Sequence, residues 1–185
     1  IGLTVVGPEL PLAMGIVDEF EARRLKIYGP NKKAAEIEKS KIFAKEFMSR
    51  HRIPTGSFKV ADSPEQALKI LNSGQFSFPV VIKADGLAAG KGVSICANIK
   101  RAEDTINDMM VKKKFGPAGE RVIIEEHLNG RELSFIVFTD GIRVQPLVTT
   151  MDHKAAYDGD KGPNTGGMGA VSPSPFVSEK LFSQI

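Results

Sequence analysis

Residues 83–92, KADGLAAGKG, decide the fold, because they place three glycines and two lysines in one short loop. Glycines let backbone N–H groups come close to phosphate oxygens, and a lysine adds positive charge. A Walker A loop needs four residues between its glycines and a Ser or Thr after its lysine. Here three residues separate Gly86 from Gly90, and a glycine follows Lys91. We interpret the stretch as a glycine hairpin that closes over a triphosphate, with a solvent-exposed turn as the alternative.

The residues on either side of this loop predict strands. A continuous apolar run, PVVI at 79–82, predicts a buried strand that ends in Lys83. A lysine in that place needs an anionic partner, because an unpaired buried charge is costly. Residues 93–96 predict a second strand, so the loop does not lead into a phosphate-binding helix. A helix is expected at 101–113, with Ala102, Ile106 and Met109 on its inner face.

Other elements follow from local patterns along the chain. Residues 63–66, SPEQ, form a capping box with proline at the first helical position, and the helix they begin stops at Gly74. An Asp-Gly pair at 140–141 predicts a two-residue hairpin loop. Further strands are expected at 3–6, 26–28, 121–126, 132–138 and 142–147, and further helices at 12–20 and 34–50. This mixture predicts an α/β or α+β fold.

Composition narrows the class of protein. With 42% hydrophobic and 25% charged residues among 185, the chain can bury a core. A net charge of +3 and the lack of tryptophan argue against a nucleic-acid binder. No apolar run reaches the roughly 20 residues that span a bilayer, so no membrane association is expected. The single cysteine, Cys96, predicts a reducing, cytoplasmic compartment and a small buried side chain rather than a catalytic thiol.

A strand exit at 122–128, VIIEEHL, carries two carboxylates. Glu125 and Glu126 can accept hydrogen bonds from an adenine amino group and a ribose, while Leu128 packs on the ring. Glu132, a few residues on, can hold the ribose hydroxyls. The alternative is an ordinary solvated strand end.

Residues 151–170 show no helix or strand period and contain five glycines, so we expect a functional or disordered loop. Within it, Asp152, His153 and Lys154 precede the glycine-rich GPNTGGMG at 162–169. A carboxylate, an imidazole and an ammonium beside glycine amides can bind a zwitterion and a developing acyl phosphate. They cannot converge on one metal ion, because neighbours on a strand point to opposite faces.

Six motifs in this order resemble one family. They are VVGPE at 5–9, SK at 40–41, IKADGLAAGKG at 82–92, IEE at 124–126, DHK at 152–154 and GPNTGGMGA at 162–170. Together they resemble the phosphoribosylamine–glycine ligase family of ATP-grasp enzymes over nearly all 185 residues.

The resemblance implies a domain plan and a set of site residues. Residues 1–31 would end an N-terminal substrate domain, and 32–185 would form a partial ATP-grasp domain with a lid at 55–128 and an incomplete base at 129–185. ATP would be held by the following residues: Lys41, Lys83, Gly86, Gly90, Lys91, Gly92, Glu125, Glu126, Leu128 and Glu132. The glycine and acceptor side would be formed by these: Glu9, Asp152, Lys154, Asn164, Thr165, Gly166 and Gly167. Catalytic roles would fall to Lys83, Asp152, His153 and Lys154.

The resemblance also implies a reaction. Glycine and 5-phosphoribosylamine would be joined through glycyl phosphate, at the expense of ATP, in purine biosynthesis. Mg²⁺ or Mn²⁺ would be required, with ligands expected beyond residue 185, since the chain reads as a piece of a longer protein. We therefore expect these 185 residues alone to bind nucleotide weakly and not to turn over. Two alternatives remain: another ATP-grasp carboxylate–amine ligase, and a nucleotide-binding module without catalysis.

Overall fold

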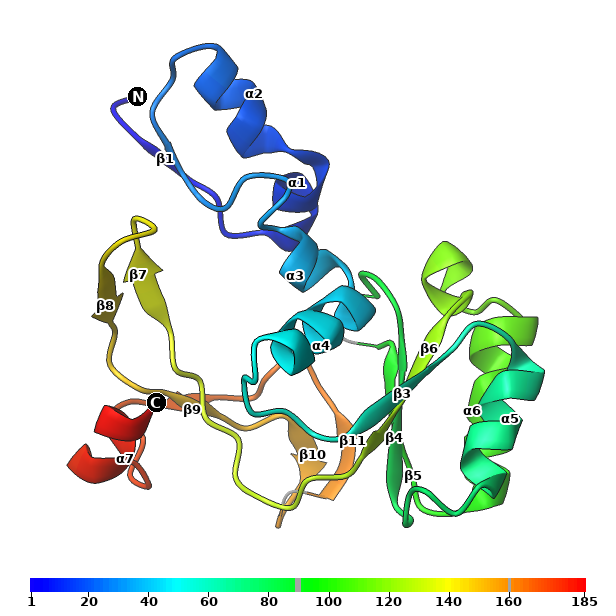
Figure 1. Ribbon diagram of the computed structural model, residues 1–185. Helices are drawn as coiled ribbons and strands as arrows, with labels where there is room; N and C mark the ends of the chain where they lie inside the picture. Colours follow the sequence, from blue (N-terminus) through cyan, green and yellow to red (C-terminus); the bar gives the residue numbers. More distant parts are fainter. Residues whose placement is uncertain (89–90, 160) are drawn as a thin grey trace. The chain divides into compact units, whose positions relative to one another are not determined.

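The computed structural model describes residues 1–88, 91–159 and 161–185 and divides into two compact units, Ile1–Leu128 and Asn129–Ile185 (Figure 1). Each unit is described by itself.

The first unit begins with two short parallel strands, β1 (Thr4–Val5) and β2 (Ile27–Tyr28), joined through helices α1 (Glu9–Met14) and α2 (Ile16–Ala22). The single helix expected here is wrong. Gly15 has a φ of 95°, and its N–H donates to a carbonyl at the end of α1, so it closes the first helix before the second begins.

The long helix expected at 34–50 is also two helices, α3 (Glu36–Lys39) and α4 (Lys41–Arg50). Ser40 interrupts them with an extended backbone, φ −120° and ψ 115°. Its hydroxyl accepts a hydrogen bond from the Phe43 N–H, which makes it the N-cap of α4. The interruption places Ser40 and Lys41 at a helix start, where they contact the glycine loop.

A four-stranded antiparallel sheet forms the centre of the first unit. Its strand order is β3–β6–β4–β5. The strands are β3 (Phe58–Ala61), β4 (Val80–Ala84), β5 (Val93–Cys96) and β6 (Val122–Glu126). The buried strand and the strand after the loop are thus confirmed.

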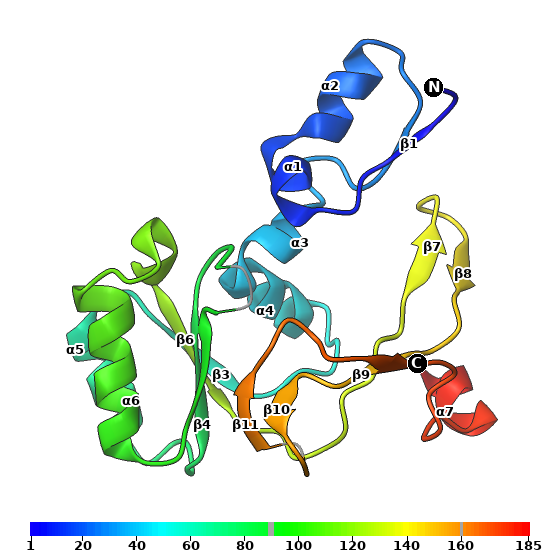
Figure 2. The same cartoon turned by 180° about the vertical axis from the view of Figure 1, so that it is seen from behind.

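Helices α5 (Pro64–Asn72) and α6 (Ile99–Ile106) cover one face of this sheet, and α4 lies on the other (Figures 1 and 2). The expected inner face of the second helix is confirmed, since Ala102, Ile106 and Met109 are all buried. The helix itself ends earlier and continues as a π-helical turn, η1 (Asn107–Val111), and a 3₁₀ turn, η2 (Gly116–Gly119), precedes β6.

Successive side chains of a strand point to opposite faces of the sheet, so neighbours in β4 and β6 face either α5 and α6 or α4. Ile82 and Ile124 point into the core under α5 and α6 and are fully buried. Their neighbours Lys83 and Glu125 therefore point to the α4 side.

The second unit is built from short antiparallel pairs. Its elements are β7 (Val137–Thr139), β8 (Val144–Pro146), β9 (Met151–Asp152), β10 (Ala155–Tyr157), β11 (Lys161–Asn164), β12 (Ala170–Val171) and helix α7 (Glu179–Gln184). The pairs are β7–β8, β9–β12 and β10–β11.

Three expectations for this unit are wrong. Residues 151–170 are not without strands, because two short pairs form inside them. The strand expected at 132–138 is reduced to β7 and a single bridge between Ser134 and Thr150. The hairpin loop has four residues, 140–143, because Asp140 Oδ1 accepts hydrogen bonds from the N–H groups of Ile142 and Arg143.

Candidate functional site

A buried carboxylate between two lysines marks the α4 side of the sheet. Glu125 on β6 receives Lys45 Nζ at 2.7 Å on Oε1 and lies 2.8 Å from Lys83 Nζ at Oε2. The side chains of Lys45 and Glu125 are 8% exposed, whereas that of Lys83 is 25% exposed. The anionic partner expected for Lys83 is therefore Glu125, and Lys83 keeps a route to solvent that Lys45 lacks.

Lys45 is absent from the residues singled out by sequence. It lies on α4 three residues after Ile42, which is buried, and so shares a helix face with it. A lysine inside that apolar stripe is the one local signal that points to it. Nothing local identifies its partner, because Glu125 is 80 residues away.

The start of α4 fixes the base of the glycine loop. Asp85 Oδ1 accepts hydrogen bonds from the Ser40 hydroxyl at 2.9 Å and from the Ile42 N–H at 3.2 Å. Lys41 Nζ donates to the Gly86 carbonyl at 2.7 Å. Gly86 has a φ of 97°, and a Cβ there would lie 3.2 Å from the Ala118 methyl group. These contacts hold the first residues of the loop, Asp85 and Gly86, against the start of α4 and next to Lys41.

Lys41 and Lys83 are the two predicted phosphate ligands that the structure describes on this side of the sheet. Burial lowers the pKa of the Lys41 ammonium below its ordinary value, although Asp85 and Glu38 act in the opposite direction. A partly buried ammonium has lost some of its favourable interaction with water. An incoming anion stabilises its charged form, because the attraction between the two charges replaces that interaction. This environment fits a phosphate group.

The far side of the loop is less fully described. Gly90 lies outside the described residues, so its predicted role stays a prediction. Lys91 is exposed, and its N–H donates to the Ala88 carbonyl at 2.9 Å. Gly92 is buried, and a Cβ there would lie 2.8 Å from the Ala88 methyl group, so only glycine fits. Ala88 thus lies next to Lys91 and Gly92.

The predicted adenosine residues stand at the end of β6. Glu126 Oε1 accepts a hydrogen bond from the Ser57 N–H at 2.7 Å. Leu128 is 64% exposed. The side chain of Glu125 is held by the two lysines, so it does not project from the strand end as the sequence suggested. The roles of all three toward a nucleotide stay predictions.

A second cluster lies in the unit 129–185. Lys154 Nζ is 3.3 Å from Glu132 Oε2 and 3.4 Å from Asp152 Oδ2. Partial burial acts to lower the pKa of Lys154, but the Glu132 hydrogen bond and charge, with those of Asp152, outweigh it and raise that pKa. The structure thus joins Glu132, expected on the nucleotide side, to two residues expected on the glycine side.

The other residues expected on the glycine side have separate positions. His153 has an exposed side chain, and its backbone pairs with residues 168 and 169. Thr165 Oγ1 accepts a hydrogen bond from the Gly167 N–H at 3.1 Å, and Gly166 between them is exposed. The side chain of Asn164 lies outside the described residues. The Thr165 N–H donates to the Lys154 carbonyl at 2.7 Å, so of the backbone N–H groups at 165–167 only that of Gly166 has no partner among the described residues.

Glu9 is the first residue of α1 in the first unit and is exposed. Its acidic side chain suits a helix N-terminus. Among the described residues of the first unit no hydrogen bond or ion pair joins it to Lys41, Lys83 or Glu125, and its substrate role stays a prediction.

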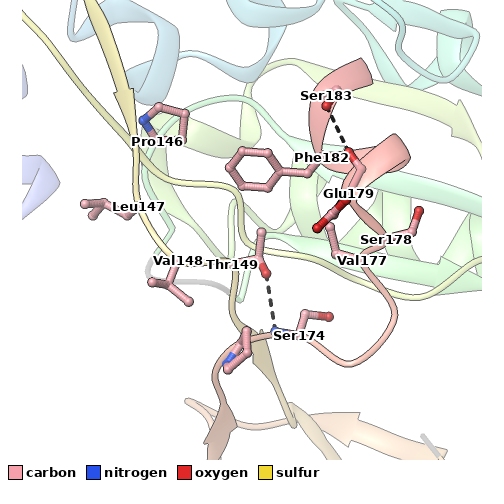
Figure 3. A pocket seen from close by; sticks show the side chains of 11 residues that line it. Pro146, Leu147, Val148, Thr149, Ser174, Val177, Ser178, Glu179, Phe182 and Ser183 are labelled. Carbon is pink, nitrogen blue, oxygen red and sulfur yellow. Dashed lines mark hydrogen bonds between the residues drawn. The ribbon is translucent and has the colours of Figure 1, made fainter.

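An open hollow of about 650 Å³ in the second unit involves none of the predicted residues (Figure 3). Pro146, Val148, Val177 and Phe182 supply apolar walls, and Thr149 Oγ1 accepts a hydrogen bond from the Ser174 N–H at 3.3 Å at its base. It carries no charged pair suited to phosphate chemistry, so we assign it no part in the site.

The residues described also bear on metals and membranes. Within 1–88, 91–159 and 161–185, no group of three or more His, Cys, Asp or Glu side chains is arranged to hold a metal ion. No helix in this described part is long and apolar enough to cross a membrane.

Comparison with known families assigns the chain to a family over its whole length. A family model described as "Phosphoribosylglycinamide synthetase, ATP-grasp (A) domain" matches residues 39–185, and the corresponding N domain model matches residues 1–38. The fold is that of the ATP-grasp class, whose members use ATP with a divalent metal. The chain belongs to the phosphoribosylglycinamide synthetase family. The predicted division at residue 31 and the predicted lid limits stay predictions.

Individual relatives agree with the family assignment. The chain is 52% identical over 185 residues to a phosphoribosylamine–glycine ligase of Caldanaerobacter subterraneus subsp. tengcongensis and covers 100% of itself and 44% of that protein. It is 51% identical to that of Pseudomonas aeruginosa, again over 100% of itself and 43% of the relative. A crystal structure of the Thermotoga maritima ligase matches with a TM-score of 0.79 and 35% identity, covering 97% of this chain and 45% of that one. The chain thus spans less than half the length of these relatives.

Proposed function

We propose that this chain is the nucleotide-binding part of an ATP-dependent ligase that joins glycine to 5-phosphoribosylamine in purine biosynthesis. The observation that carries the proposal is the glycine loop fixed to α4, with Lys41 at its base and the partly exposed Lys83 beside it. The family assignment and the named relatives support the choice of substrates.

The reaction has two steps. A glycine carboxylate oxygen attacks the γ-phosphorus of ATP, and the bond to the ADP oxygen breaks to give glycyl phosphate. The amine of 5-phosphoribosylamine then attacks the glycyl carbonyl, loses a proton, and displaces inorganic phosphate. Both steps depend on positioning and on neutralising negative charge rather than on a covalent enzyme intermediate.

In this proposal the first unit handles the nucleotide. Lys41, Lys83 and Lys91 contact phosphate oxygens, and the glycine positions of the loop offer backbone N–H groups. Glu126 and Leu128 contact the adenosine. Lysines suit this role because an ammonium is a compact charge with three rotatable donors.

The second unit handles the reacting groups. Lys154 stabilises the negative charge that develops on the acyl phosphate, and the backbone N–H of Gly166 acts in the same way. Asp152 and Glu132 hold Lys154 and offer carboxylate oxygens to the glycine ammonium and to ribose hydroxyls. His153 of this unit is assigned to the acceptor amine, as is Glu9 of the first unit.

A divalent metal, Mg²⁺ or Mn²⁺, would neutralise the β- and γ-phosphate oxygens. The described carboxylates of the site are each engaged by a lysine or a backbone N–H, and no three of them are arranged around a cation. The described residues fit the phosphates and not the metal, so we name no metal ligand within residues 1–185.

The test is ADP release by a ligase of full family length that contains residues 1–185. It is measured with magnesium-ATP, glycine and freshly generated phosphoribosylamine, omitting each in turn, and repeated with Lys83→Ala. Release that needs all three substrates and collapses in the variant supports the proposal. Release that ignores glycine indicates a different ATP-grasp ligase, and binding without turnover indicates a non-catalytic nucleotide module.

A further inference from the structure

Lys45 has no hydrogen-bond donor left for a ligand. An ammonium has three N–H donors. Lys45 Nζ directs them to Thr55 Oγ1 at 2.6 Å, the Gly56 carbonyl at 3.3 Å and Glu125 Oε1 at 2.7 Å. The residue is 6% exposed. Lys45 therefore makes no direct hydrogen bond to a nucleotide in this arrangement, and Glu125 is the charged group that it contacts.

Lys83 is in the opposite situation. Among the described residues its side chain has one ion-pair partner, Glu125 Oε2, at 2.8 Å but not in hydrogen-bonding geometry, so this buried oxygen has no hydrogen-bond donor. With 25% of its side chain exposed, Lys83 can direct its donors to a group arriving from solvent.

The side chains of Lys45, Lys83 and Glu125 together carry a net charge of +1, from two ammoniums and one carboxylate. At these distances and this burial, opposite charges attract strongly, so the number of lysines on Glu125 matters. If Glu125 had Lys83 alone, the pair would be neutral, and Lys83 would have to leave a buried carboxylate to meet an anion. With Lys45 in place, Glu125 is already neutralised.

We propose that Lys45 is a positioning residue for the triphosphate: by neutralising Glu125 it leaves the charge of Lys83 available to a phosphate oxygen. The inference rests on the proposed function, because that function supplies the phosphate.

The surroundings hold this arrangement in place. A Cβ on Gly56 would lie 3.2 Å from Glu125 Oε1, so glycine leaves room for the carboxylate. The Phe58 ring centroid is 5.6 Å from Lys45 Nζ, which adds a cation–π contact. Lys45 cannot swing toward the glycine loop without losing all of these contacts.

The experiment compares Mg-ATP dissociation constants, measured by calorimetry, in the ligase of full family length. The variants are Lys45→Met, Lys45→Met with Glu125→Gln, and Lys112→Met. Lys112 is the matched control, because it also contacts a carboxylate at 2.8 Å but is 65% exposed. KM for ATP and kcat are measured alongside, and melting curves monitor folding.

Lys45→Met should weaken Mg-ATP binding by about tenfold or more, the scale of one hydrogen bond to a charged group, with KM for ATP rising more than kcat falls. Adding Glu125→Gln removes the carboxylate charge, frees Lys83 again, and should restore tighter binding than in Lys45→Met alone. The Lys112→Met variant should bind as the wild type does.

Unchanged binding in Lys45→Met, or a double variant that binds more weakly still, overturns the proposal and leaves Lys45 a purely structural anchor. If Lys45→Met does not fold, the double variant decides: binding within about tenfold of wild type supports the proposal, and weaker binding overturns it. If the wild type binds Mg-ATP but shows no glycine-dependent ADP release, the proposed ligase function is wrong and the role of Lys45 still stands. If the wild type does not bind Mg-ATP, both the ligase function and the role of Lys45 are wrong.

Discussion

Asp85 offers the sharpest test of how the glycine loop is held. Its Oδ1 accepts two hydrogen bonds, from the Ser40 hydroxyl and the Ile42 N–H, at the positively polarised start of α4. Each bond to a carboxylate contributes about 1.5 kcal/mol or more, which partial exposure reduces, so Asp85→Ala should lower the unfolding free energy by about 2 kcal/mol. Asp85→Asn keeps an acceptor oxygen and loses only the charge, so it should cost about 1 kcal/mol or less.

The assay is urea unfolding followed by far-ultraviolet circular dichroism, because the chain contains no tryptophan. Hydrogen exchange of peptides covering α4 then locates the loss, which should be strongest in its first turn. Asp62→Ala is the matched control, since Asp62 pairs with Arg121 at 2.6 Å but is 62% exposed and should contribute at most about 1 kcal/mol. Equal stability of wild type and Asp85→Ala, with unchanged exchange in α4, would refute the reasoning.

Three further outcomes follow from single positions. A Cβ on Gly119 would clash with the Met109 carbonyl oxygen, so Gly119→Ala should destabilise the chain by about 2 kcal/mol or more in thermal melts. Gly130 has open space around it, so the control variant Gly130→Ala should change the melting temperature little. Equal melting temperatures of the two variants would contradict this prediction. Burial raises the pKa of the Cys96 thiol, so a thiol reagent should label it slowly until urea unfolds the chain, and rapid native labelling would show that the site is open. The folded-state pKa of Lys154 is raised, so the stabilisation it contributes is complete below the ordinary lysine pKa and is lost as pH rises through the folded-state pKa. The unfolding free energies of wild type and Lys154→Met should therefore converge at alkaline pH. A difference that stays constant with pH would contradict this prediction.

Local sequence patterns were sufficient for β4 and for the buried face of the helix after β5, but not for the helix breaks at Gly15 and Ser40. The apolar run before Lys83 predicted β4, and helical spacing predicted that Ala102, Ile106 and Met109 would be buried. The strand pattern at 93–96 also predicted a loop between two strands rather than before a helix. These features depend on side-chain period and on turn residues, both of which are visible in a short window.

The missed features depend on contacts between distant residues or on very short elements. The role of Lys45 depends on its contact with Glu125, which is 80 residues away in the sequence and so cannot be recognised from a local pattern. The strands inside 151–170 have two to four residues, too few to show a period, and the β9–β12 pair is closed by residues 152 and 170. The Asp140 side chain, by binding two N–H groups, favours a longer hairpin loop than its Asp-Gly signal suggests.

The most direct test of the proposed ligase chemistry is the fate of a carboxylate oxygen of glycine. The ligase of full family length that contains residues 1–185 is supplied with glycine labelled by a heavy oxygen isotope, magnesium-ATP and phosphoribosylamine, and the released phosphate is analysed by mass spectrometry. Attack of the carboxylate on the γ-phosphorus predicts one labelled oxygen in each phosphate released. Unlabelled phosphate, formed at the same rate as the ligated product, would contradict the acyl phosphate route.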